Sequence, residues 1–395
     1  MPFSSLSAAL IAALVGFGGT VALIVQAAQA LGGTPEQVAS AVTALCLGMS
    51  VAGGLLSAGL RMPVVLAWST PGAALLAAST LQAGYGAAIG AYVVAALMMI
   101  VLGLVPALGR LAARIPAAVA AAMLAGVLLP FCLALFRSFQ SDAVLAGVVL
   151  VVFVIARQRL PIYALLIVLA VVVGAVVLRD DLGPAGGILA QQGVFGVLHA
   201  TAPVFDWAVV ISLGLPLFLV TLVSQNLPGF VVLNAAGYRP PTRPVLLATG
   251  AASLVLAPFG AIAVNLAAIT AALCTGPDAH PDPQRRWVVG VAYAGCYAVL
   301  ALFSTPLVAL FMGLPRDTIL IITGVALLGP LTNALGAMFS VPDDREVAVM
   351  TFAATASGVV LLGIGSAFWG LATGFLVLGV RAGLARLRPG RAGRT

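Results

Sequence analysis

Two short polar turns interrupt apolar stretches of the chain, and each has the residue types of a helix N-terminus. In the first turn, at 69–72, Thr70 is a good N-cap and Pro71 suits the first helical position. In the second, Asn265 is a good N-cap for the apolar run 266–273. A helix that begins inside a membrane directs its free N–H groups and its positive dipole end at an anion. The two turns therefore predict a shared anion site.

A simpler interpretation is that Pro71 and Pro258 only kink two continuous membrane spans. Each segment, however, contains both a proline and a capping residue, and an extended apolar run, at 63–68 or 259–264, precedes the cap. We therefore favour two half-helices that start in the middle of the membrane.

A third polar group interrupts the apolar run 216–229, where Ser224, Gln225 and Asn226 are consecutive. In hydrocarbon each of these side chains needs a partner. Asn and Gln commonly hydrogen-bond neighbouring membrane helices, so for Asn226 this role and a ligand contact stay equally open, whereas for Gln225 we favour a ligand contact. Gln26 is a further binding candidate, and Trp68 is a candidate for an aromatic wall, although apolar core is the commoner use.

The composition decides the class of protein that must position these residues. Of 395 residues, 62% are hydrophobic and only 7% are charged, whereas soluble domains have about 25% charged residues. Stretches such as 144–155 and 165–178 are apolar on every face, which excludes the alternating pattern of a membrane barrel. The sequence predicts an all-α polytopic membrane protein.

The apolar segments predict fourteen spans, two of which are the half-helix segments. They are 6–31, 36–57, 63–79, 85–108, 115–136, 142–156, 160–178, 207–227, 243–257, 258–275, 286–305, 316–338, 347–362 and 366–380. With the N-terminus inside, fifteen of the 18 basic residues fall on the cytoplasmic side and only Arg137, Arg179 and Arg316 fall outside. We expect a bacterial inner (plasma) membrane protein with both termini in the cytoplasm.

Internal matches at a separation of about 200 residues predict a repeat. The motif around Gly126 and Pro130 parallels the motif around Gly324 and Pro330, and further matches keep their order. Seven spans per copy is an odd number, so the second copy must enter the membrane upside down, as in secondary transporters. The predicted repeats are 1–200 and 201–395.

No acidic, basic or histidine residue is central in a predicted span. Buried carboxylate proton relays, voltage sensors and metal clusters are therefore unsupported. We expect no cofactor, no metal site and no enzymatic activity, because nothing provides a nucleophile with its base. The arginines lie in gaps between spans and in a tail without aromatic residues, which argues against nucleic-acid binding.

The longer motifs resemble the benzoate/proton symporter family of the BenE type. The resemblance rests on AWSTPGAALL at 67–76, MLAGVLLPF at 123–131, LPLFLVTLVSQNLPG at 215–229, AAGYRPP at 235–241, LAPFGAIAVNLAAITAALCTGPDAHPDP at 256–283 and TASGVVLLGIGSAFWGL at 355–371. It implies the seven-plus-seven inverted-repeat fold of uracil permease and the anion exchangers. In that fold a core domain, here about 1–110 and 206–305, moves against a gate domain, here about 111–200 and 306–395.

The resemblance also implies where the substrate binds, between the half-helices of spans 3 and 10. Together with the candidates above, the expected substrate-binding residues are Ser69, Thr70, Gly72, Gln225, Asn226, Val264, Asn265, Gln26 and Trp68. Gln225 and Val264 stand where nucleobase permeases have acids, which suits an anionic substrate and leaves the proton's carrier unidentified. The implied partners are an aromatic carboxylate, protons and the lipid bilayer, with a monomer and a homodimer both open.

The expected function is proton-coupled uptake of benzoate or a similar aromatic carboxylate by an elevator-like movement of the core. An anion entering a cell that is negative inside works against about 2.3 kcal/mol per 100 mV, so at least one co-transported proton is physically sensible. The alternative function is a channel or exchanger for small organic anions.

Overall fold

Long apolar helices make up most of the computed structural model, which describes residues 3–79, 84–105, 116–181, 183, 193–267 and 269–387. Within these ranges, eight helices are long and apolar enough to cross a membrane. The number is nine if the bent pair Pro283–Leu302 and Ser304–Gly313 forms one span. The chain is therefore a mostly helical membrane protein, as the composition predicts.

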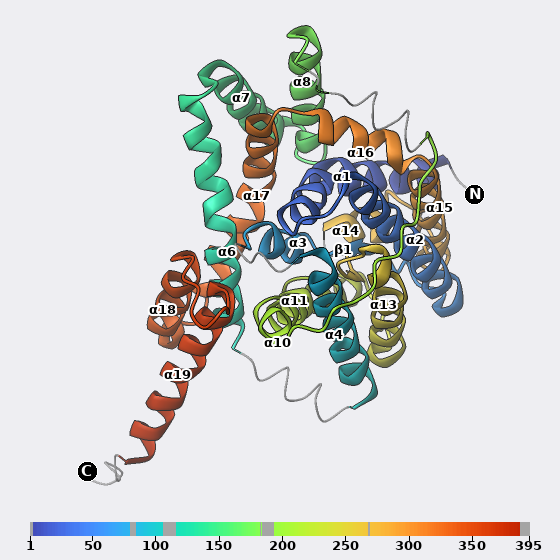
Figure 1. Cartoon of the computed structure of the whole chain (residues 1–395). Helices are drawn as coiled ribbons and strands as arrows, with labels where there is room; N and C mark the ends of the chain where they lie inside the picture. Colours follow the sequence, from blue (N-terminus) through green and yellow to red (C-terminus); the bar gives the residue numbers. More distant parts are fainter. Residues whose placement is uncertain are drawn as a thin grey trace.

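A larger group of helices, here called the larger bundle, combines the first elements of both halves of the sequence (Figure 1). From the first half come α1 Phe3–Ala30, α2 Pro35–Leu60, β1 Leu66–Trp68, α3 Thr70–Ala77 and α4 Tyr85–Leu104. From the second half come α10 Trp207–Val209, α11 Leu215–Thr221, α12 Leu227–Ala235, α13 Thr242–Leu256, β2 Val264–Leu266, α14 Ile269–Thr275 and α15 Trp287–Leu302. The packing of α2 on α15 and of α4 on α13 joins the two halves.

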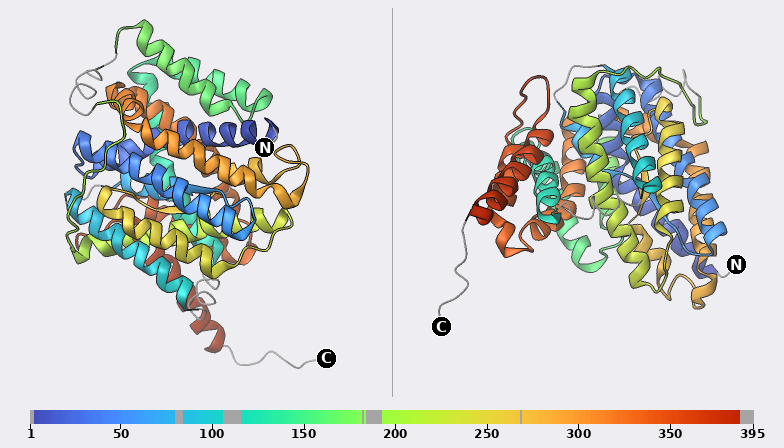
Figure 2. Two further views of the ribbon diagram at one scale, coloured as in Figure 1. Left: turned by 90° about the vertical axis from the view of Figure 1, so that its right-hand side faces the viewer. Right: turned by 90° about the horizontal axis from the view of Figure 1, so that it is seen from below.

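The remaining long helices form a smaller bundle beside the first, as the right-hand view of Figure 2 shows. Its members are α6 Ala117–Arg137, α7 Ala143–Arg159, α8 Ala164–Leu178, α17 Arg316–Met338, α18 Arg345–Ala356 and α19 Ser366–Leu387, while α16 Ser304–Gly313 leads into it from α15. The repeated glycines allow close contacts between its helices. A Cβ on Gly324 would lie 2.8 Å from the Phe131 carbonyl oxygen, and one on Gly126 would lie 2.9 Å from that of Phe352.

The strands β1 and β2 are a departure from the all-α expectation. β1 lies inside the extended run expected at 63–68, and a short helix follows it, as expected. The second extended segment comes later than the expected 259–264. The chain first makes a 3₁₀ turn, Ala257–Phe259, and then a left-handed turn at Gly260 with φ of 91°. β2 therefore occupies Val264–Leu266, and α14 begins at Ile269 instead of 266.

The two ends of the larger bundle are closed by different segments. At one end, the guanidinium of Arg61 lies 5.1 Å from the Trp287 ring centroid, and the Ser5 hydroxyl donates to the Ala279 carbonyl oxygen at 2.8 Å. At the other end, the segment 193–206 crosses several helices. Its His199 N–H donates to Ser40 Oγ of α2 at 2.9 Å, and its Val204 N–H donates to the carbonyl oxygen of Gly86 of α4 at the same distance.

Candidate functional site

The two predicted turns meet at the centre of the larger bundle, because β1 and β2 pair with each other. The pair is antiparallel, with Leu66 opposite Leu266, Ala67 opposite Asn265 and Trp68 opposite Val264. The ladder continues beyond the strands, since the Ser69 N–H donates to the Ala263 carbonyl oxygen at 3.3 Å and the Ala267 N–H to that of Val65 at 2.9 Å. Segments almost 200 residues apart in sequence are thus brought together as expected.

Ser69, and not Thr70, caps α3. The Ser69 Oγ accepts the Gly72 N–H at 3.1 Å and the Thr221 hydroxyl of α11 at 2.9 Å. The prediction of Thr70 as N-cap is therefore wrong by one residue: Thr70 is the first helical residue and Pro71 the second. The shift is physically allowed because the second helical position also lacks an intrahelical donor bond, so proline loses nothing there.

Most donors at the N-terminus of α3 are already used. The Gly72 N–H is bound by Ser69 Oγ, the Ala73 N–H donates to the Ser69 carbonyl oxygen at 2.8 Å, and Pro71 has no N–H. Among the described residues, the Thr70 N–H alone at this end has no partner. A ligand here would meet one backbone donor and the positive end of a short dipole.

Gly72 allows α11 to approach this helix end. A Cβ on Gly72 would lie 2.5 Å from Leu217 Cδ1 and 2.8 Å from Ser69 Oγ. The glycine thus allows close packing beside the cap. Any larger residue would push apart α3 and α11, the two helices that donate hydrogen bonds to Ser69.

Asn265 does not cap α14, contrary to the prediction. It lies within β2, and α14 begins at Ile269. Its side chain is completely buried, with Nδ2 donating to the Leu266 carbonyl oxygen at 3.0 Å. Its Oδ1 has no hydrogen-bond partner in the described part of the chain. A buried polar atom without a partner costs about 1–3 kcal/mol, so a ligand or water that donates to Oδ1 would be stabilised.

Val264 packs into the interior of the larger bundle. It is 2% exposed, and its backbone N–H donates a hydrogen bond to Ser253 Oγ at 2.9 Å. A Cβ on Gly48 of α2 would lie 2.8 Å from Val264 Cγ2. The Val264 side chain therefore faces α2.

Asn226 bonds across the bundle. It is fully buried, its Oδ1 accepts the Leu266 N–H of β2 at 3.0 Å, and its Nδ2 lies 3.6 Å from Met99 Sδ. These contacts with β2 and α4 correspond to the packing role that the sequence leaves open beside a ligand contact. Asn226 supplies the partner that the edge of β2 would otherwise lack.

Gln225 differs from its neighbour. It is half-buried and has no hydrogen bond to any described residue. It lies in a π-helical segment, Leu222–Asn226, that Pro228 helps to create because a proline cannot donate to the carbonyl of Ser224 four residues earlier. Such π segments often occur at functional sites, where they widen the helix and redirect side chains.

Trp68 is a buried core residue, which is the commoner of the two uses that the sequence leaves open. It is 2% exposed, and its Nε1–H donates to Thr20 Oγ1 at 2.7 Å. Its ring centroid lies 5.6 Å from that of Phe17 and 6.3 Å from that of Tyr297. Trp68 therefore fixes α1 against the crossing of the strands.

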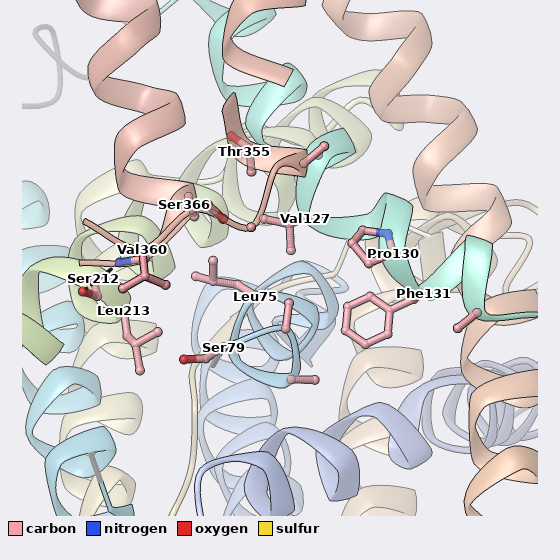
Figure 3. Close-up of a pocket in the computed structure, with 18 of the residues that line it drawn as sticks. Leu75, Ser79, Val127, Pro130, Phe131, Ser212, Leu213, Thr355, Val360 and Ser366 are labelled. Carbon is pink, nitrogen blue, oxygen red and sulfur yellow. Dashed lines mark hydrogen bonds between the residues drawn. The ribbon is translucent and has the colours of Figure 1, made fainter. Parts of the chain in front are cut away.

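Gln26 lines a cavity of about 310 Å³ between the two bundles, and no residue of β1 or β2 is among the lining residues. Figure 3 shows part of this lining. The cavity is lined by Gln26 of α1, by 75 and 77–79 at the end of α3, by Ser212 and Leu213, and by residues of α6, α17, α18, α19 and the hairpin 357–365. Sequence reasoning found only Gln26. Most of the other lining residues, such as Val127 and Phe131, are ordinary apolar residues in an apolar chain and give no local signal.

All eleven acidic residues and both histidines of the sequence lie in the described part of the chain, so their placement is complete. They occupy helix starts and connecting segments: Glu36, Asp142, Asp180, Asp181, Asp206, Asp278, Asp282, Asp317, Asp343, Asp344, Glu346, His199 and His280. None of these side chains belongs to β1 or β2, and none lines the cavity.

Solved structures share this fold. The transmembrane domain of the cyanobacterial bicarbonate transporter BicA superposes with a TM-score of 0.60 at 14% identity, covering 95% of this chain and 98% of that one. SLC26A9 superposes with a TM-score of 0.63 at 14% identity, covering 95% of this chain and 65% of that one. At this identity the likeness concerns the fold alone.

Sequence relatives cover nearly the whole chain. It is 39% identical over 377 residues to the inner membrane protein YdcO of Escherichia coli, spanning 95% of each protein. It is 34% identical over 376 residues to the benzoate membrane transport protein of Acinetobacter baylyi, spanning 94% of each. The family model described as BenE, benzoate membrane transport protein, matches residues 1–380. The chain belongs to the BenE family of benzoate membrane transport proteins.

Proposed function

We propose that this protein takes up benzoate or a similar aromatic carboxylate together with a proton across the bacterial inner membrane. The observation that carries the proposal is the crossing of β1 and β2, which joins the start of α3 to the polar residues of the second half inside an apolar bundle. The family and the fold support a membrane transporter of anions.

The proposed architecture is fourteen spans in two inverted repeats. Its support is the order of elements: α1, α2, β1 with α3 and α4 correspond to α10–α12, α13, β2 with α14 and α15. The same holds for α6, α7 and α8 against α17, α18 and α19. The larger bundle is then the core domain and the smaller bundle the gate domain, and alternating access is an elevator-like shift of one against the other.

The proposed substrate site lies beside the strand crossing. The Thr70 N–H and the amide of Gln225 are donors without partners among the described residues, and both suit a carboxylate. The unpartnered Oδ1 of Asn265 adds an acceptor for a water or a protonated carboxyl group. Ser69, Gly72, Asn226, Val264 and Trp68 hold this arrangement together through the contacts described above.

Uptake into proteoliposomes tests the function. With labelled benzoate outside, we expect accumulation that requires an acidic exterior and that collapses when a protonophore removes the pH gradient. Protein-free liposomes are the necessary control, because the neutral acid crosses lipid by itself. Uptake that ignores the pH gradient but requires an anion inside would contradict symport and indicate the alternative, an exchanger.

Orientation gives a separate prediction. The end of the bundle closed by 193–206 should face outward, because the arginine count places only three of the 18 arginines there. With the four native cysteines replaced, Asp181→Cys should react with an impermeant maleimide added to whole cells, and Arg243→Cys should react only after the membrane is permeabilised. The opposite pattern at both positions would reverse the topology.

A further inference from the structure

The cavity between the bundles is separate from the proposed substrate site. It is lined by 75 and 77–79, at the C-terminal end of α3, whereas Ser69 and Thr70 form the other end of the same helix. An eight-residue helix is about 12 Å long, so the two places lie at opposite ends of that length. A ligand in the cavity would therefore contact different residues from a ligand at the strand crossing.

The shape and lining of the cavity suit a small aromatic ring. Its volume of about 310 Å³ lies at the lower end of the range for small-molecule sites. Leu75, Val127, Pro130, Phe131 and Leu213 surround it, as Figure 3 shows. Apolar side chains with one phenyl group provide the contact area that a monocyclic aromatic compound needs.

The polar groups of the lining are mostly occupied. The Ser212 hydroxyl donates to the Gly363 carbonyl oxygen and accepts the Gly365 N–H, both at 3.2 Å, and the Thr355 hydroxyl donates to the Thr351 carbonyl oxygen at 2.9 Å. Gln26 is different, because its Oε1 is buried without a partner among the described residues. A primary amide both donates and accepts, so it can form two hydrogen bonds at once with a protonated carboxyl group.

The electrostatics of the cavity favour a neutral ligand. None of the lining residues is charged, and the C-terminal end of α3 presents the negative end of the helix dipole. An ionised carboxylate would lose its hydration here and gain no cation, whereas the protonated acid has no charge to desolvate.

We propose that this cavity binds the neutral, protonated form of the aromatic acid, with its carboxyl group paired to the amide of Gln26 and its ring against Phe131. The proposal rests on the proposed function and deepens it: the proton taken from the external water enters the protein on the substrate, and no protein carboxyl group has to carry it.

The hairpin 357–365 forms one wall of this cavity. Gly358, Val360 and Gly365 line the cavity, and the two hydrogen bonds of Ser212 attach the hairpin of the smaller bundle to the larger one. These hydrogen bonds hold the hairpin between the two bundles, beside the cavity.

Benzamide is the probe that separates the two ligand forms, because it has the shape of benzoic acid and no charge at any relevant pH. Calorimetry on the purified full-length protein should show benzamide binding with the same affinity at about pH 5 and about pH 7, while the apparent affinity for benzoate falls about tenfold per pH unit above the ligand's own pKa. Gln26→Leu should weaken benzamide binding about tenfold or more, which corresponds to the loss of about one good hydrogen-bonded pair. Gln29→Leu, at an exposed position on the same helix, should bind as the wild type does.

A second variant keeps the test valid if Gln26→Leu misfolds. Ala134→Phe adds a ring to the cavity lining without removing a polar group and should also prevent benzamide binding. Absence of benzamide binding by a wild type that takes up benzoate, or unchanged binding by Gln26→Leu, overturns the proposal. Benzamide binding that depends on Gln26 in a protein without pH-driven benzoate uptake supports the cavity site and rejects the proposed function, so the two failures are distinguishable.

Discussion

Ser69→Ala is expected to lower benzoate uptake about tenfold or more, because one hydroxyl holds two elements of the proposed site. Its Oγ accepts the Gly72 N–H at the start of α3 and the Thr221 hydroxyl of α11. Loss of a helix cap costs about 0.5–2 kcal/mol, and a buried hydroxyl left without its acceptor costs about 1–3 kcal/mol more. Because 1.4 kcal/mol is a factor of ten in an equilibrium, the ordered helix end that meets the carboxylate should be largely lost.

Thr70→Val is the matched comparison, since it removes the hydroxyl of the next residue, which caps nothing in this structure. We expect a smaller loss of uptake from Thr70→Val than from Ser69→Ala, and a lower midpoint of thermal unfolding only for Ser69→Ala. Both values should be normalised to folded protein in the membrane. A larger defect in Thr70→Val would mean that the cap is where the sequence alone places it, at Thr70.

The elements of the site could be predicted from sequence because each has a local cause. An apolar run followed by a serine or threonine, a proline and a glycine predicts a strand-like segment and then a helix, and this is what 63–77 forms. The error of one residue at Ser69 arises because serine and threonine are both good caps and proline is accepted at either of the first two positions. Local propensity does not distinguish these alternatives.

Asn265 shows why the second half-helix is harder to predict from sequence. Its type predicts a cap, but its backbone is held in β2 by pairing with Ala67, almost 200 residues away. The turn at Gly260 moves the extended segment towards the C-terminus, so that the asparagine falls within the strand. Tertiary pairing therefore overrides a local preference here.

The cavity could not be predicted at all from local patterns. Its walls come from α1, the end of α3, α6, α18 and α19, and what they share is only their place in space. Gln26 is a candidate from the sequence because an amide in an apolar helix is unusual, but the sequence gives no sign that Gln26 lines this cavity and that Gln225 does not. That difference between the two amides is a result of the fold.

Gln225→Glu is expected to reduce benzoate uptake about tenfold or more near neutral pH and to recover part of it at lower pH. The neutral amide can donate to a carboxylate, whereas an ionised carboxylate can only accept and repels the substrate. The variant should recover as its new carboxyl group takes up a proton and becomes a donor again. An unperturbed glutamate titrates at about 4.3, so the ratio of variant to wild-type uptake should rise as the pH falls towards that range.

The ratio is the informative quantity, because uptake by the wild type itself changes with the proton gradient. Asn226→Asp is a useful comparison: the new carboxylate can still accept the Leu266 N–H, but a buried charge is costly, so its effect should fall on the amount of folded protein. Its uptake normalised to folded protein should then change little with pH. If Gln225 instead joined helices, its replacement would lower the amount of folded protein and leave the normalised uptake unchanged. That interpretation is disfavoured because Gln225 has no hydrogen bond to any described residue. A normalised ratio that stays constant between about pH 5 and about pH 7.5 would contradict a Gln225 that faces the substrate.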